Sequence, residues 1–365
     1  MKAQPYIVLF EIGSTKLRAA FARRDEDGQL HLADLQEKEG CYMHRGLLEN
    51  VERVEFDLNH LWLLLSNSCD DFGQAYLCLC NDDDENLRKA NAAMIEEIIG
   101  LHRGSNRELV YVGSPLKHTV EALTSQEERQ KGCLYLDFGA GHTHVQCYYH
   151  NKSLIQKSLP VGGDDITNDI ASDVEVSLKE AEMLKVRQGN AVSNQVKKAY
   201  IRFVQPNTGQ TKALLNTDLA NRIEDRLTTD CIQPYLKALK GHGFFDRIPM
   251  DIVLSGGASQ MKGLELLLQN SCPQAGIRRA DASSLLAGED QKYNRPEYHS
   301  LLGLLQSLTM FEPPKEGLGR FFRRDPKKKK EEKKKKEPTL TPGIPEEKTK
   351  LDKKVDNLMD AIYTD

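Results

Sequence analysis

The 365-residue sequence predicts an α/β protein with two lobes, in each of which helices flank a mixed sheet. One pattern occurs twice, at residues 7–22 and 134–149: an apolar run, an acid, any residue, a glycine, a small polar turn and a second apolar run. Each copy is typical of a β-hairpin. Helical and strand-like segments alternate after each copy, so each hairpin is expected to begin a lobe.

The tips of the two predicted hairpins are the most informative segments. They carry residues 11–14, Glu-Ile-Gly-Ser, and residues 137–141, Asp-Phe-Gly-Ala-Gly. Glycine at such a tip lets backbone N–H groups point at an anion, because no Cβ blocks the approach. Two tips that face each other across a cleft would grip the phosphates of a nucleotide. One tip alone is weak evidence, since glycine-rich hairpins are common.

The first lobe is predicted to comprise residues 1–131 together with 296–311. After the hairpin, its expected elements are strands at 30–35, 74–80 and 109–112, helices at 57–68 and 87–100, a helix opened by Ser114-Pro115, and the final helix at 298–309.

The second lobe is predicted to comprise residues 132–295. Its expected elements are three strands within 134–160, helices at 164–172 and 175–187, a hairpin at 198–214, a long helix at 218–240, a buried strand at 251–255 and a helix at 263–270.

Charge and cysteine content exclude several classes of function. Residues 315–365 hold 16 Lys and Arg against 11 Asp and Glu, whereas the whole chain has a net charge of −4, so the body is acidic and nucleic-acid binding is not expected. None of the eight cysteines forms a C-x-x-C pair, which argues against zinc and thioredoxin-like sites. Scattered free thiols indicate a reducing cytoplasm. Neither a signal peptide nor a membrane-spanning segment is expected.

The C-terminal region has a different composition. Residues 312–348 are rich in Lys, Glu and Pro and predict a disordered basic linker, and residues 349–365 predict an amphipathic helix. Between 315 and 336, 12 positive residues against 4 negative ones, with two phenylalanines, would suit an anionic lipid surface. A solvated linker explains 315–336 equally well, and the apolar side of 349–363 would fit either a membrane or a groove on a partner.

A third motif lies at residues 251–264, DIVLSGGASQMKGL. A strand that ends in Gly-Gly lets a flat ring lie against the backbone, and the start of a nearby helix can meet a phosphate. Taken alone, this piece is better interpreted as a tight strand–helix connection.

Taken in order, these motifs resemble the actin-like ATPase superfamily. Within it the chain is most similar to FtsA, the bacterial cell-division family that tethers FtsZ filaments to the membrane. The resemblance spans residues 6–305 and is carried by residues 43–52, 159–171, 177–191, 219–227, 251–264 and 298–305.

The resemblance implies that ATP and Mg²⁺ bind between the lobes. Gly13, Ser14, Thr15 and Lys16 would form the first phosphate loop, and Asp137, Gly139, Ala140, Gly141, His142 and Thr143 the second. Gly162, Gly256, Gly257 and Ala258 would back the nucleotide. Asp137 would hold Mg²⁺ through water, and Glu11 and Asp137 are the candidate catalytic residues. Glu182 and Lys185 share one helical face and would reach the ribose, although without the resemblance a solvated ion pair is the better interpretation.

The sequence departs from the family pattern inside the candidate site and beyond it. The second loop has His142 and His144 where the family has a hydroxyl and an acid. Lys117, His118 and Glu121 replace small residues in the helix that packs the lobes together. The family's extra subdomain, called 1C, is reduced here to residues 81–86, so self-association would take a different form or be lost.

The resemblance therefore implies an ATP-binding scaffold of the septum, located in the cytoplasm at the inner face of the cell membrane. It would link FtsZ or other divisome proteins to that membrane. Hydrolysis is expected to be slow or absent, because the sequence offers no convincing general base. The two loop histidines favour an alternative, a nucleotide-free pseudo-ATPase adaptor. A small-molecule kinase of the same superfold is a further alternative, but the sequence shows no acceptor-binding segment.

Overall fold

The computed structural model describes residues 5–66, 72–80, 85–205, 208–234, 236 and 250–309. The chain divides into one unit that ends at Phe311 and a second unit that begins at Glu312. The predicted linker, the predicted terminal helix and residues 81–84 lie outside the described residues.

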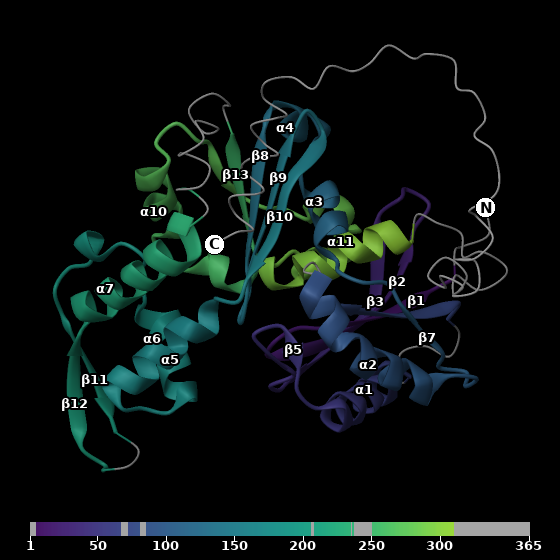
Figure 1. Ribbon diagram of the computed structural model, residues 1–365, viewed down its shortest axis with the longest axis horizontal. Helices are drawn as coiled ribbons and strands as arrows, with labels where there is room; N and C mark the ends of the chain where they lie inside the picture. The colour runs from purple at the N-terminus through teal and green to yellow at the C-terminus, as the bar shows by residue number, and fades with distance from the viewer. Residues whose placement is uncertain are drawn as a thin grey trace, which may run out of the picture. The chain divides into compact units, whose positions relative to one another are not determined.

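Two five-stranded sheets form the framework of the first unit, and they share one topology (Figure 1). The first sheet has the order β3-β2-β1-β6-β7, and the second has the order β10-β9-β8-β13-β14. In each sheet a hairpin and a third strand pair antiparallel. A fourth strand pairs parallel with the first strand of the hairpin, and a fifth pairs parallel with the fourth. The predicted mixed sheets of two lobes are thereby confirmed.

The strands of the first sheet are β1 (Ile7–Ile12), β2 (Lys16–Arg24), β3 (Leu30–Glu39), β6 (Gln74–Leu79) and β7 (Leu109–Tyr111). Those of the second are β8 (Cys133–Phe138), β9 (Thr143–Tyr149), β10 (Lys152–Leu159), β13 (Asp251–Ser255) and β14 (Ile277–Arg279). Two small antiparallel pairs are β4 (Met43–His44) with β5 (Leu47–Leu48), and β11 (Tyr200–Val204) with β12 (Thr211–Leu215).

The hairpin tips are shorter than the sequence predicts. Ile12 pairs with Leu17, and Phe138 pairs with Thr143, so Glu11 and Asp137 belong to strands and not to the tips. Hydrogen bonding continues to the last apolar residue of each run, and the acid before it is included in the strand.

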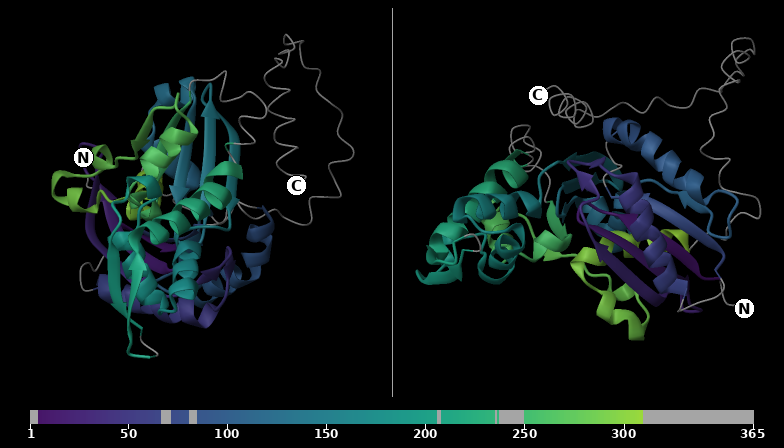
Figure 2. Two further views of the ribbon diagram at one scale, coloured as in Figure 1. Left: turned by 90° about the vertical axis from the view of Figure 1, so that its left-hand side faces the viewer. Right: turned by 90° about the horizontal axis from the view of Figure 1, so that it is seen from below.

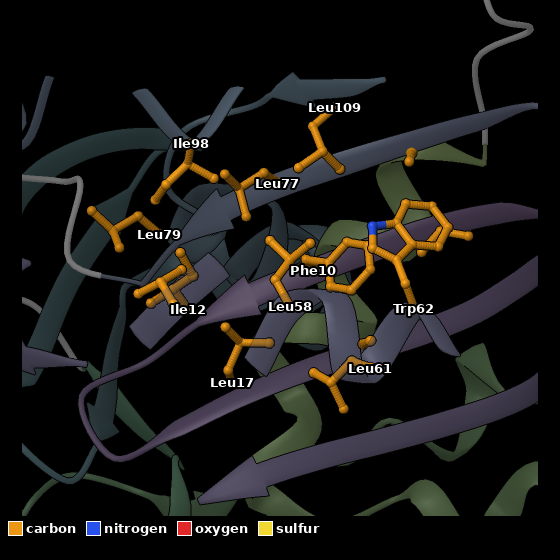
Figure 3. Close-up of a cluster of buried hydrophobic side chains, with 14 of the residues drawn as sticks. Phe10, Ile12, Leu17, Leu58, Leu61, Trp62, Leu77, Leu79, Ile98 and Leu109 are labelled. Carbon is orange, nitrogen blue, oxygen red and sulfur yellow. The ribbon is translucent and has the colours of Figure 1, made fainter. Parts of the chain in front are cut away.

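The first lobe is covered by α1 (Val51–Ser66) and α2 (Glu85–His102). The predicted start of α1 at residue 57 is wrong, because Asn50 accepts a hydrogen bond from the backbone N–H of Arg53 and caps the helix six residues earlier. Figure 3 shows the core beneath α1, where Trp62 lies beside Phe10 with their ring centroids 4.9 Å apart.

Between the two sheets lie α3 (Leu116–Leu123) and α11 (His299–Leu308), packed against each other (Figures 1 and 2). A Cβ on Gly303 would collide with the backbone of Thr119, so glycine is required for this close approach. Lys117 and Glu121 are exposed to solvent and do not hold the two helices apart, although their length and charge suggest looser packing.

The second lobe holds α4 (Gln126–Lys131), α5 (Gly163–Val174), α6 (Leu178–Gln188), α7 (Asn216–Arg226) and α10 (Leu264–Ser271). The predicted helix at 218–240 is helical throughout its described residues: it begins at Asn216, is π-helical over Leu227–Ile232 and is α-helical again at 233–234, and residues 237–249 lie outside the described part. Short 3₁₀ segments cover Ser193–Gln195, Gly257–Gln260, Ser283–Leu285, Gly288–Tyr293 and Pro296–Tyr298. Among the described residues, no element lies between β6 and α2.

Candidate nucleotide-binding site

The two glycine tips, one from each sheet, meet each other. A Cβ built on Gly141 would lie 2.6 Å from Ser14 Oγ and 3.0 Å from Ser14 Cβ. The structure thus brings together the two loops that the sequence predicts to face each other.

Local hydrogen bonds fix the first tip. The Gly13 N–H donates to the Lys16 carbonyl at 2.8 Å, and the Ser14 carbonyl accepts from the Tyr42 N–H at 3.0 Å. Within the described part of the chain, the N–H groups of Ser14 and Thr15 donate to no backbone carbonyl, so they are suited to an anion. The ammonium of Lys16 is 2.7 Å from Glu37 on β3, and the structure does not present it at the tip.

The second tip rests on the N-terminus of α5. The N–H groups of Gly163 and Asp164 donate to the carbonyls of Gly139 and Ala140 at 3.0 and 2.7 Å. A Cβ on Gly162 would collide with the Ala140 carbonyl, which explains glycine there. These amides therefore hold the loop in this conformation. The hydroxyl of Thr143 donates to the Val161 carbonyl at 2.8 Å and is turned away from the tip.

A third wall is formed by the turn after β13. Ser255, the last residue of β13, pairs with Asp137, and a Cβ on Gly256 would collide with the Asp137 carboxylate. Gly256 also has a φ of +81°, which favours glycine. The Cβ of Ala258 lies 3.3 Å from the position of a Cβ on Gly163. Gly257 is less confined, since a Cβ placed there would lie 3.8 Å from its nearest neighbour.

Glu182 and Lys185 of α6 do converge on this region, at the first turn of α5. Lys185 Nζ lies 2.8 Å from both the Gly163 carbonyl and Thr167 Oγ1, and 2.6 Å from Glu182 Oε2. The side chain of Lys185 is only 8% exposed, whereas that of Glu182 is 46% exposed. Lys185 is therefore a buried tie between α5 and α6, and Glu182 remains the more accessible of the two.

Glu11 has both carboxylate oxygens engaged. Arg18 Nη1 is 2.8 Å from Oε2, Ser300 Oγ is 2.5 Å from Oε1, and the Glu11 side chain is fully buried. A carboxylate held by a guanidinium and a hydroxyl is poorly placed to take a proton from water. We therefore assign Glu11 no proton-transfer step, although the sequence marks it as a catalytic candidate.

His142 reaches from the second loop to the β4–β5 hairpin of the first lobe. It forms a hydrogen bond with the backbone of Arg45, and its Nε2 lies 3.1 Å from the position of a Cβ on Gly46. Burial, reinforced by His144, lowers the pKa of His142 to about 3, so its imidazole is neutral near pH 7. A neutral ring would offer a phosphate at most one N–H donor and no charge.

The residues of the two tips meet some of the requirements for binding a nucleotide phosphate, but not all of them. Two amides of the first tip and the half-buried Asp137 border this region, yet Ser14 and Gly141 touch where phosphates would lie. In the described ranges, no three His, Cys, Asp or Glu side chains gather closely enough to hold a metal ion. Asp137 would therefore hold Mg²⁺ only together with water and phosphate oxygens. A hollow of about 340 Å³ lies elsewhere, along residues 23–31 and 287–289, and includes none of the predicted site residues.

Sequence reasoning missed Arg18 and Ser300. Arg18 lies directly opposite Glu11 in the hairpin register, so the pair was detectable from the spacing about the tip. Ser300 lies 289 residues away from Glu11, and no local signal connects them.

Comparisons with known proteins show which families this chain is similar to. Residues 134–303 match the family model described as Cell division protein FtsA. The Cell division protein FtsA of Bacillus subtilis (strain 168) is 27% identical over 186 residues, which are 51% of this chain and 40% of that protein. The corresponding protein of Rhizobium meliloti is 29% identical over 157 residues, 42% of this chain and 35% of that protein. The chain spans less than half the length of the curated relatives it matches.

Solved structures with the same fold are more distant in sequence. A chain of the PilM–PilN type IV pilus biogenesis complex superposes with a TM-score of 0.59 at 16% identity, covering 83% of this chain and 98% of that one. MreB5 of Spiroplasma citri bound to ADP superposes with a TM-score of 0.56 at 14% identity, covering 82% and 95%.

Two sheets of identical topology, with α3 and α11 between them and glycine tips in contact, define a protein of the actin-like fold. Within that class, residues 134–303 are similar to the cell-division family FtsA, and the described residues include no 1C subdomain.

Proposed function

We propose that this protein is a nucleotide-binding scaffold of bacterial cell division. The observation that carries the proposal is the contact between the two glycine tips, within a fold whose second lobe matches the FtsA family model. ATP is the nucleotide that the resemblance implies, and the scaffold would link FtsZ or other division proteins to the inner face of the cell membrane.

The first phosphate contacts would come from the backbone N–H groups of Ser14 and Thr15. Asp137, half-buried against Gly256, would hold Mg²⁺ through water. When bound, the metal-loaded nucleotide would supply the charged groups to which both loops could bind. Because Glu11 is fully engaged by Arg18 and Ser300 and cannot act as a general base, hydrolysis would be slow or absent.

In the proposed mechanism, nucleotide binding is coupled to the angle between the two lobes. Ser14 and Gly141 touch in this structure, so phosphates can enter only after the tips separate. A ligand shifts such an equilibrium only by its different affinities for the two states. The nucleotide would therefore set the lobe angle, and the lobe angle would set the affinity for neighbouring proteins.

Equilibrium binding of ATP, measured with and without Mg²⁺, tests this function. We expect Mg²⁺ to raise the affinity of the parent protein, and Asp137→Ala to remove that increase. Absence of ATP binding under both conditions contradicts the proposal. An Asp137→Ala variant that binds Mg²⁺–ATP as tightly as the parent contradicts the metal role alone.

Membrane and partner contacts are tested separately. FtsZ pull-down by the full chain, compared with a chain ending at Phe311, examines the partner and the need for residues 312–365. Co-sedimentation with anionic liposomes, lost on deletion of 315–336, would support lipid contact by the basic segment, whereas loss only on deletion of 349–363 would assign it to the terminal segment. No helix in the described part of the chain is both long and apolar enough to cross a bilayer.

A second candidate function is a nucleotide-free adaptor on the same fold. It is favoured by the position of His142, which connects the second loop to Arg45 where a phosphate-binding loop would need freedom. The adaptor would capture division proteins in the pull-down while binding no ATP, so the two experiments together separate the candidates.

A further inference from the structure

Two consecutive residues in the first turn of α11 form hydrogen bonds with strands of different lobes. His299 Nδ1 lies 3.0 Å from Ser255 Oγ, at the end of β13 in the second sheet. Ser300 Oγ donates to Glu11 Oε1 at 2.5 Å, near the end of β1 in the first sheet. One helical turn therefore holds both sheets.

The bond between His299 and Ser255 lies in the interior, whereas the bond between Ser300 and Glu11 is partly buried. Ser255 and Glu11 are fully buried, and His299 is 1% exposed. Ser255, Glu11 and His299 are therefore shielded from water, and a buried polar group that loses its partner is costly. Burial also lowers the pKa of His299 to about 4, so the imidazole stays neutral and its bond is unchanged near pH 7.

Each strand leads directly into a glycine segment of the candidate site. Glu11 lies two residues before Gly13 of the first tip. Ser255 immediately precedes Gly256, which is packed against Asp137 at the base of the second hairpin. A displacement of either strand end is therefore passed within two residues to a tip or to the wall beside it.

We propose that Ser255 and Ser300 are positioning residues that set the distance between the two glycine tips, by attaching both strand ends to α11. Arg18 supports this arrangement, because its guanidinium binds Glu11 and lies over the ring of Tyr298, 5.6 Å from the centroid. On this proposal, separation of the tips would break or bend one of the two bonds. The role of these residues in ligand binding rests on the proposed nucleotide function, but their effect on the tips does not.

A disulfide between the tips measures this effect without nucleotide. The Cβ positions at Ser14 and Gly141 are 3.0 Å apart, so the pair Ser14→Cys and Gly141→Cys should form a bond after a small relaxation. Cys80 lies near Gly13 and is changed to Ala in every protein of the series to prevent exchange. The measured quantity is the effective concentration of the pair in a glutathione buffer.

Ser300→Ala releases the first strand end, and Ser255→Ala releases the second. Each should lower the effective concentration by about tenfold, the effect of losing one buried hydrogen bond. Ser300→Thr keeps the hydroxyl and should restore the parent value. Ser271→Ala is the matched control, because that hydroxyl donates to the Leu267 carbonyl within its own helix, and it should change nothing.

Unchanged effective concentrations in both alanine variants overturn the proposal. A decrease in only one of them also overturns it, since the coupling requires both bonds. The effective concentration can decrease in both alanine variants while the parent protein, without the engineered cysteines, binds no ATP. In that case the positioning role stands and the proposed nucleotide function fails. If ATP binds and neither variant changes the disulfide, the nucleotide function stands and the positioning role fails.

Discussion

The buried ion pair at the end of the first hairpin gives the sharpest test of how this lobe is held together. Arg18→Met keeps most of the side-chain volume but removes the charge opposite Glu11. Glu11 is fully buried, and only Ser300 would then stabilise its carboxylate. Breaking one partner of a buried pair costs about 3–5 kcal/mol, and the remaining hydrogen bond places the expected loss near the lower end of that range.

Adding Glu11→Gln to Arg18→Met should recover most of the loss. The amide is neutral and can still accept from Ser300, so no uncompensated charge remains. We expect the double variant to lie within about 1–2 kcal/mol of the parent, because replacing a whole buried pair by neutral groups is often nearly neutral. The cycle thus separates the cost of an isolated charge from the loss of packing.

Urea unfolding followed by tryptophan fluorescence is the suitable assay. Trp62 is the only tryptophan and is buried in the core of the same lobe. Lys16→Met is the control, because the side chains of Lys16 and Glu37 are about one-third exposed and such pairs contribute roughly 0–1 kcal/mol. A loss below about 1 kcal/mol for Arg18→Met, or a double variant no more stable than the single one, would refute the reasoning.

Two further predictions concern packing and protonation. Gly303→Ala should destabilise the protein by about 1–3 kcal/mol, because the new methyl collides with Thr119, whereas Gly100→Ala on α2 has open space and should be neutral or stabilising; thermal melting distinguishes them. In the folded protein the pKa values of His142 and His299 are lowered to about 3 and about 4 from the ordinary value of 6.5. Below pH 6.5 the unfolded chain therefore binds more protons than the folded one. The contribution of these histidines to stability is complete above that pH and decreases as the pH falls below it. Between pH 7.0 and 5.5 each histidine should contribute about 1 kcal/mol to the decrease in unfolding free energy, and a His299→Gln variant with an unchanged slope would contradict this.

Local patterns were sufficient for the regular elements of this fold. The two hairpins were predictable because each has an uninterrupted apolar run on both sides of a glycine turn, and both faces of these strands are largely buried. The start of α1 was missed, although the buried positions Val54, Leu58, Leu61 and Leu65 follow a helical period that begins just after the cap at Asn50. The π-helical segment after Arg226 has no periodic signal, since the same residues continue a helical pattern.

In the candidate site, the glycines could be predicted from the sequence, whereas the contacts of the charged groups could not. Glycines at 13, 139, 141, 162 and 256 were identified from motifs, and at each of these positions a Cβ would approach another atom to within 3.2 Å in the folded chain. The contacts that orient charged groups were not predictable. Lys16 pairs across the sheet with Glu37, and Ser300 reaches Glu11 over 289 residues, so both depend on tertiary packing.

The position of His142 opposes phosphate binding at the second loop. In a phosphate loop, this position should offer a small donor that leaves room for the ligand, whereas here a buried neutral ring spans to the backbone of Arg45. Opening the tips far enough for phosphates would expose that ring or strain its hydrogen bond, so part of the binding free energy would be consumed in breaking the contact. The same contact stabilises the closed arrangement when no nucleotide is present. This contact therefore favours the closed tips when no ligand is present, and a bound nucleotide would shift the equilibrium toward the separated tips.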